Sequence, residues 1–401
     1  MAAQEYQAPE SVGRLQQRAL IIGGVALLVS IFGAVRSPGD FYQSYLVSFL
    51  LILGLTVGSL GLVMLQHLTS GHWGIIIRRP LEAATRTLPL MAIAFLPIAL
   101  FGMQHLYSGH GDEKGWLNAP PTGEGALSAF QKNYLTRNGF YTRAVIYFVI
   151  WLALMFIFNI LSKQQDANRE DRALRLRFKM LAGPGIILYV FAMTFAAIDW
   201  VMSLSPHWAS TIYGFLFVAG QLISSMSLMI AVVVLLARTE PFSSVLQKRH
   251  LHDLGKLLLA FVMLWAYFDF SQLLIIWSGN QPEEISFYRT RLYGGWGIVA
   301  VIVLVFHFFV PFFLLLSQDV KRNAKVLPKI AMWLIFMRLV DLFWMTRPEF
   351  TSHAAPTPLD IVLPIALGGL WLGFFAFNLK QCPLLPLGDP KLAEAIEHHE
   401  H

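Results

Sequence analysis

Charged residues are scarce in this chain. Only 13% of its 401 residues are Asp, Glu, Lys or Arg, whereas soluble domains carry about 25%. Hydrophobic residues make up 56% of the chain, and the mean hydropathy is +0.57. This composition excludes an ordinary soluble fold and indicates a protein of the lipid bilayer.

Cysteine is almost absent, since Cys382 is the single one. Iron–sulfur clusters need several thiolates, and covalent attachment of c-type haem needs a CxxCH motif. A b-type haem usually needs two axial ligands on facing helices, and His307 has no second histidine at its depth in the predicted bundle. We therefore expect no cofactor to be bound by this chain alone.

A signal peptide and β-strand alternation are also missing. The N-terminus, MAAQEYQAPESVGRLQQRAL, has neither a basic start nor a small-residue cleavage site, so the first apolar segment is expected to stay. The apolar segments are too long for barrel strands and do not alternate with polar residues. An all-α integral membrane bundle is predicted.

Ten apolar stretches are long enough to cross a bilayer, for which about 20 residues are needed. The predicted spans are 19–35, 42–65, 87–107, 141–162, 180–203, 210–237, 256–278, 293–316, 327–346 and 359–379.

The basic residues predict the orientation. Of the 30 Lys and Arg residues, 21 lie on the side that carries both termini, 8 lie on the other side, and Arg338 lies within a helix. The positive-inside rule then makes both termini cytoplasmic. Because the excess lies in short loops, the net charge of +6 does not indicate a nucleic-acid partner.

Two predicted helices share an unusual pattern. Asp199 and Asp341 lie near the ends of spans five and nine, and each is followed seven positions later by a proline, Pro206 and Pro348. Matching carboxylates suggest two four-helix bundles in a parallel pseudo-repeat. The predicted units are a cytoplasmic N-terminus with peripheral helix 1 (1–40), the bundles (41–204 and 205–348), and peripheral helix 10 with a cytoplasmic tail (349–401).

Ionisable residues inside spans are costly and point to function. His105, Asp199, Asp269 and Asp341 are all expected in the outer third of the membrane, close enough to meet in one pocket that transfers protons. Arg338 lies one turn before Asp341, a spacing that allows an ion pair, whereas Asp199 is expected to be unpaired in an apolar wall. The alternatives are carboxylates that simply meet water and bridges that only hold helices together.

His307 stands near the middle of span eight, in VLVFHFFVPFF. We expect it to be hydrogen-bonded to a neighbouring helix, with a role in a proton relay as the alternative.

Aromatic residues accompany the acids. Trp200, Trp265, Tyr267 and Trp344 flank them, and Gln272 follows Asp269 by one turn. An aromatic wall beside hydrogen-bonding groups suits a quinone ring, which makes these five residues candidates for binding quinone or quinol. Core packing and an interfacial aromatic belt are the alternatives.

The longest predicted loop, 108–139, faces the outside and suggests an extracytoplasmic partner. The polar tail KLAEAIEHHEH ends in histidines, which we interpret as surface residues rather than a metal site.

Three segments resemble a known family: FAAIDWVMSLSPHWASTIYGF, the stretch DLGKLLLAFVMLWAYFDFSQLLIIWSGNQPEEISFYRTR, and GMQHLYSGH. They are similar to the ActF-type membrane subunits of alternative complex III, a bacterial quinol:cytochrome c oxidoreductase, in the NrfD/PsrC-like superfamily. The resemblance runs over most of the chain. The positions that match the polar residues within the membrane in this family are His105, Asp199, Asp269, Arg338 and Asp341.

The resemblance implies two four-helix bundles with two peripheral helices, in a multi-pass protein of the bacterial cytoplasmic (inner) membrane. It also implies other membrane subunits as partners, including an ActC-like homologue, together with lipids and extracytoplasmic iron–sulfur and multihaem cytochrome c subunits. Haem c and iron–sulfur clusters would then lie in these partner subunits, and ActF-type subunits are thought to conduct protons.

Three functions follow as hypotheses. The first is a subunit of a respiratory or photosynthetic quinol oxidoreductase, not catalytic alone, which passes protons near the extracytoplasmic face. The second is a proton- or ion-coupled secondary transporter, since parallel repeats also occur in transporters. The third is a passive membrane anchor for redox subunits.

Overall fold

The computed structural model describes residues 6–110, 113–123, 125–167, 172–240, 242–389 and 392. Within these residues the regular structure is helical, apart from two antiparallel two-residue strands, β1 (Gly109–His110) and β2 (Glu113–Lys114), in the long loop. Arg169 and Lys391, which entered the charge count, and the closing histidines of the tail lie outside the described residues.

In the described part of the chain, seven helices cross the bundle without interruption. They are α1 (Glu10–Arg36), α2 (Pro38–Thr69), α7 (Arg137–Ala167), α8 (Arg172–Trp200), α9 (Tyr213–Leu236), α11 (Lys248–Gly279) and α17 (Leu359–Leu379). An eighth, α16 (Leu327–Thr346), has 20 residues.

Two further crossings are interrupted by π-helical turns. The first consists of α3 (Arg78–Thr85), α4 (Leu88–Pro97), η2 (Ile98–Gly102) and α5 (Met103–Leu106). The second consists of α13 (Trp296–Val303), η4 (Leu304–Phe309) and α14 (Val310–Leu316). Proline removes a backbone donor, and Pro97 and Pro311 adjoin the two turns, which is a local reason for the break.

Short elements make the connections. They are η1 (His72–Gly74), α6 (Ala129–Tyr134), η3 (Met202–Leu204), α10 (Phe242–Val245), α12 (Pro282–Leu292), α15 (Gln318–Arg322) and η5 (Arg347–Glu349).

In the part of the chain described, nine helical segments are long and apolar enough to cross a membrane. The remaining segment, α16, is a helix of similar length that carries Lys329, Arg338 and Asp341. All ten predicted spans are therefore helices, and the prediction of an all-α, multi-pass membrane protein is confirmed.

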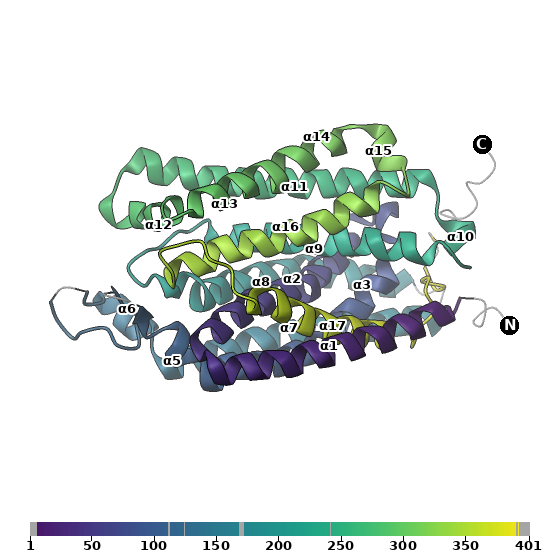
Figure 1. Ribbon diagram of the computed structural model, residues 1–401. Helices are drawn as coiled ribbons and strands as arrows, with labels where there is room; N and C mark the ends of the chain where they lie inside the picture. The colour runs from purple at the N-terminus through teal and green to yellow at the C-terminus, as the bar shows by residue number, and fades with distance from the viewer. Residues whose placement is uncertain are drawn as a thin grey trace.

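The bundle has a buried centre. In Figure 1 the long helices run roughly parallel, and α2 and α9 lie in its middle. The most apolar stretch of α2 is buried over its whole length. α9 packs against α2, α8, α11 and α16, so it joins the helices of both predicted units. The division into two repeated units itself stays a prediction.

The first and last helices form a pair at one side of the bundle (Figure 1). Their backbones approach closely at Gly23 and Gly369, where a Cβ on Gly369 would lie 2.7 Å from the Cα of Gly23. Small residues allow this kind of contact between membrane helices, where packing rather than the hydrophobic effect drives association.

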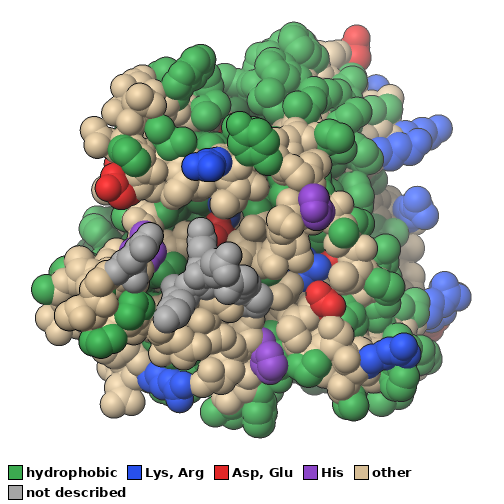
Figure 2. Space-filling view, turned by 60° about the vertical axis from the view of Figure 1, so that its left-hand side comes forward, with side chains coloured by type: hydrophobic (Ala, Val, Ile, Leu, Met, Phe, Trp, Pro, Cys, Tyr) green, Lys and Arg blue, Asp and Glu red, His purple; other side chains and the backbone are tan. Residues whose placement is uncertain are grey.

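The surface of the long helices is apolar. Ile21, Leu28 and Val35 on α1 and Val145 on α7 are more than half exposed. Figure 2 shows hydrophobic side chains over the flank of the molecule and Lys and Arg side chains at its right-hand edge. A broad exposed apolar surface of this kind is suited to lipid rather than water.

Candidate functional site

An ion pair lies within the second predicted unit. Arg338 and Asp341, on α16, are 2% and 1% exposed, and the Arg338 guanidinium donates to an Asp341 carboxylate oxygen one turn further along the helix. The predicted i,i+3 pair is thus present. A glycine on α9 makes room for it, because a Cβ on Gly220 would lie 2.3 Å from Arg338 Cζ.

A second carboxylate lies beside this pair. Asp269, half-buried on α11, is close enough to interact electrostatically with both Asp341 and Arg338. Among the described residues it has no hydrogen bond or ion pair. Arg338 is paired with Asp341, so Asp269 is the acid of this cluster with no donor of its own in the described chain.

His307 and Trp265 complete the cluster. The His307 imidazole is fully buried in the π-helical turn η4, and its ring centroid lies 4.4 Å from that of Trp265. Neither ring nitrogen of His307 has a hydrogen-bond partner in the described chain, so the expected bond to a neighbouring helix is wrong. Trp265 Nε1 lies near the Asp341 carboxylate, although the hydrogen-bond geometry is not met.

A polar path leads from Asp269 towards the end of the bundle. Asp269 interacts electrostatically with the Tyr288 phenol on α12. Gln272 donates from Nε2 to the Tyr288 hydroxyl at 3.4 Å and accepts from the Ser210 hydroxyl at 3.0 Å. Burial first, and then the Asp269 charge, raises the pKa of the Tyr288 phenol above its usual value, so this hydroxyl stays protonated.

The path ends at a small cavity of about 130 Å³. Ser210, Gln272 and Glu284 line it, together with apolar side chains of α11. This volume is below the range of about 300–1,000 Å³ of ligand pockets but holds several water molecules.

Asp199 lies in a different environment. Its carboxylate accepts from Arg143 Nε and Nη2, each at 2.8 Å, and from the Tyr147 hydroxyl at 2.6 Å. The prediction that Asp199 is unpaired is therefore wrong, because two side chains of α7 reach it. These bonds connect α7 to α8 and satisfy the Asp199 carboxylate.

Tyr134 covers the Asp199 site. Its ring lies 3.8 Å from the Arg143 guanidinium carbon. Burial first, and then the charge of Asp199, raises the pKa of the Tyr134 hydroxyl to about 12. The hydroxyl lies beside Asp199 and Tyr147 but has no hydrogen-bond partner with good geometry in the described part of the chain.

The other predicted residues are spread over the molecule. His105 is half-buried and stacks on Tyr42 with a centroid distance of 5.2 Å. Trp200 is fully buried, with Phe95 4.7 Å away in the aromatic core. Trp344 donates to the Arg291 carbonyl, and Tyr267 is 65% exposed.

A third group of charges lies at the opposite end of the bundle. Arg78 and Arg79, at the start of α3, are 1% and 3% exposed, and both pair with Glu82. Ser162 of α7 donates to Glu82 and accepts from Arg79. The charge count treated these arginines as part of a loop, so the sequence did not reveal that they are buried.

Within the described residues, no group of three or more His, Cys, Asp or Glu side chains has the arrangement of a metal site. Compared with protein-family models and with curated proteins, the chain matches none.

Proposed function

We propose that this chain is an integral membrane subunit of a respiratory or photosynthetic quinol:electron-acceptor oxidoreductase of the alternative complex III type. In this role it passes protons near the extracytoplasmic face and is not catalytic alone. The observation that carries the proposal is Asp269, a carboxylate with no donor of its own beside the buried Arg338–Asp341 pair. The family named in the proposal rests on the resemblance of three sequence segments to ActF-type subunits.

Quinol oxidation needs a nearby group that can accept a proton. Quinol oxidation releases two protons with two electrons, and an acceptor placed near the site lowers the cost of deprotonation. Asp269 takes up a proton, while the Arg338–Asp341 ion pair beside it stays charged. Water in the cavity beside Glu284 then accepts the proton from Asp269, and Gln272 orients the Tyr288 and Ser210 hydroxyls along the way to it.

As part of the proposal, the quinone ring contacts the lipid-facing side of α11. Tyr267 is exposed there, two residues before Asp269, and Gln272 lines the nearby cavity. Trp200 and Trp265 are enclosed by protein, so their role is packing around the two acidic sites. Haem c and iron–sulfur clusters belong to the proposed extracytoplasmic partners, and an ActC-like subunit lies beside this one in the membrane.

The test begins with a tagged chain purified in mild detergent. We expect other membrane subunits and c-type haem absorbance to co-elute, and the preparation to oxidise quinol with cytochrome c as acceptor. The variant Asp269→Asn should assemble normally and turn over about 100-fold more slowly, the range of general acid–base catalysis. The exposed carboxylate of Asp319 on α15 provides the matched control, Asp319→Asn, which should be unaffected.

A colourless protein without companions contradicts the proposal. Normal turnover of an assembled Asp269→Asn complex contradicts the proton role and favours a passive anchor.

The two interrupted crossings favour one further candidate, a proton- or ion-coupled secondary transporter. Transporters use broken helices at their binding sites, and η4 contains the buried His307. Solute uptake by the purified chain in liposomes under a pH gradient, lost in Asp269→Asn, supports transport over the redox role.

A further inference from the structure

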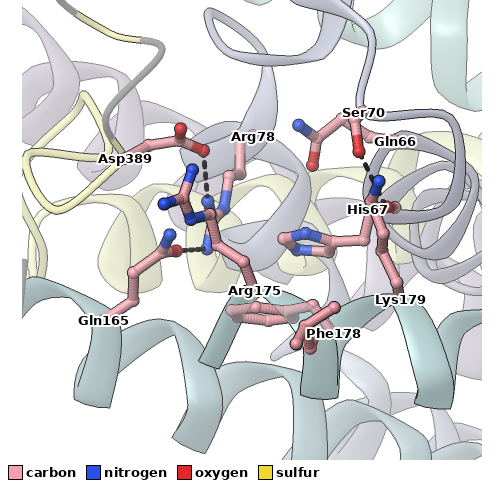
Figure 3. Close-up of a pocket in the computed structure, with 10 residues that line it drawn as sticks. Gln66, His67, Ser70, Arg78, Gln165, Arg175, Phe178, Lys179 and Asp389 are labelled. Carbon is pink, nitrogen blue, oxygen red and sulfur yellow. Dashed lines mark hydrogen bonds and ion pairs between the residues drawn. The ribbon is translucent and has the colours of Figure 1, made fainter. Parts of the chain in front are cut away.

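A cavity of about 390 Å³ opens at the end of the bundle where α2 and α7 end and α8 begins (Figure 3). Its volume lies in the range of about 300–1,000 Å³ of small-ligand pockets. The proposed proton path does not involve it. The lining residues used below are Gln66, His67, Arg78, Arg175, Lys179 and Asp389.

Two buried polar atoms at this cavity have no partner in the described chain. His67 is 8% exposed and Gln66 is 5% exposed, and His67 Nε2 and Gln66 Oε1 lack a hydrogen bond. The His67 ring stacks on Phe178 at 3.9 Å and extends into the cavity (Figure 3). Buried polar groups are normally satisfied, so these atoms indicate a ligand or ordered water.

The charge around the cavity is positive. Among the described residues that line it, Arg78, Arg175 and Lys179 are basic and Asp389 is acidic, and Arg78 is also paired with Glu82 behind the cavity. Arg78 is held in place by bonds to Asp389 at 3.0 Å and to Gln165 at 2.7 Å. Arg175 and Lys179 are exposed and lie one turn apart on α8, so both can reach one ligand.

An apolar stripe continues from the cavity along α8. Leu176, which lines the cavity, is 62% exposed, and Met180, Ile187 and Phe191 are 73%, 58% and 59% exposed. Their spacing of four or seven residues puts them on one side of the helix. Acyl chains packed along this stripe would put the cavity at the depth of the lipid headgroups.

We propose that this cavity binds the phosphate group of an anion, and that the position at the headgroup layer favours an anionic phospholipid as its source. Arg175 and Lys179 pair with the phosphate oxygens, and His67 donates from Nε2. The acyl chains lie along the stripe that begins at Leu176. This inference is independent of the proposed redox role.

The test is native mass spectrometry of the detergent-purified full chain with phosphatidylglycerol or phosphatidylcholine. We expect wild type to retain phosphatidylglycerol preferentially. Arg175→Gln and Lys179→Gln should each weaken it roughly fivefold, since one basic residue near a membrane surface contributes about that factor. Arg177→Gln, a change of an exposed arginine on α8 that does not line the cavity, should leave the affinity unchanged.

A thermal-shift measurement with inorganic phosphate separates the two sources. Stabilisation by phosphate that Arg175→Gln abolishes, without selective retention of phosphatidylglycerol, assigns the site to a free anion. Equal retention of the two lipids by wild type with no effect of phosphate overturns the proposal. So does an equal loss in Arg177→Gln and Arg175→Gln, because general surface charge would then explain the binding.

Discussion

Asp199 and Asp341 occupy matching places in the sequence but differ in how the protein satisfies them. Asp199 accepts three hydrogen bonds from Arg143 and one from Tyr147, all from the neighbouring helix α7. Asp341 is paired within its own helix, with Arg338, and has a second carboxylate nearby on α11. The first site is an ion pair that connects two helices. The second site contains two carboxylates and one arginine.

The difference shows that sequence position does not define the electrostatic role of a buried carboxylate. Both helices end in a 3₁₀ turn, η3 after α8 and η5 after α16, so the local backbone is similar. The donors that reach each acid are set by the neighbouring helices. A proton-accepting function is therefore favoured at the second site, where one arginine lies beside two carboxylates.

The largest expected effect is on the second site. Arg338→Met leaves Asp341 buried without its partner, which costs about 3–5 kcal/mol of folding stability. We expect most of this variant to aggregate or unfold when it is heated in detergent, as measured by size-exclusion chromatography. The double variant Arg338→Met/Asp341→Leu should regain folded protein, because no uncompensated charge remains. A single variant as stable as wild type contradicts the description of the pair as buried.

The matching change at the first site should cost less. Arg143→Met removes the bidentate partner of Asp199, but the Tyr147 hydroxyl remains, and the Arg143 side chain is 19% exposed so that water can replace it. We expect a loss of about 1–3 kcal/mol. A loss as large as that of Arg338→Met in the same heating experiment would remove the distinction between the two sites.

The smallest expected effect is a pH dependence at the first site. The pKa of Tyr134 is raised to about 12 in the folded protein, against about 10 in an unfolded chain. The folded state therefore binds more protons between these values, so the stability due to Tyr134 is complete below pH 10 and is lost as the pH rises towards 12. Tyr134→Phe should flatten the fall in melting temperature over this interval. An identical fall in the variant contradicts the assignment.

The fold could be predicted from hydropathy because a spanning helix satisfies its own backbone and needs only length and apolar side chains. The Arg338–Asp341 pair could be predicted because helical spacing places the two residues on one face. The Arg143–Asp199 pair could not, since its members are 56 positions apart and meet only when α7 packs on α8. The absence of a hydrogen-bond partner for His307 in the described chain could not be predicted either, because His307 lies in a π-helical turn that hydropathy does not indicate.

The pairing of α1 with α17 has a consequence for biosynthesis. α1 is synthesised well before α17, so the contact between Gly23 and Gly369 cannot form until α17 has also been made and inserted. A nascent chain that stops before Leu359 leaves that side of α1 facing lipid or a chaperone. The pairing thus makes the final packing of α1 depend on a helix synthesised more than 300 residues later.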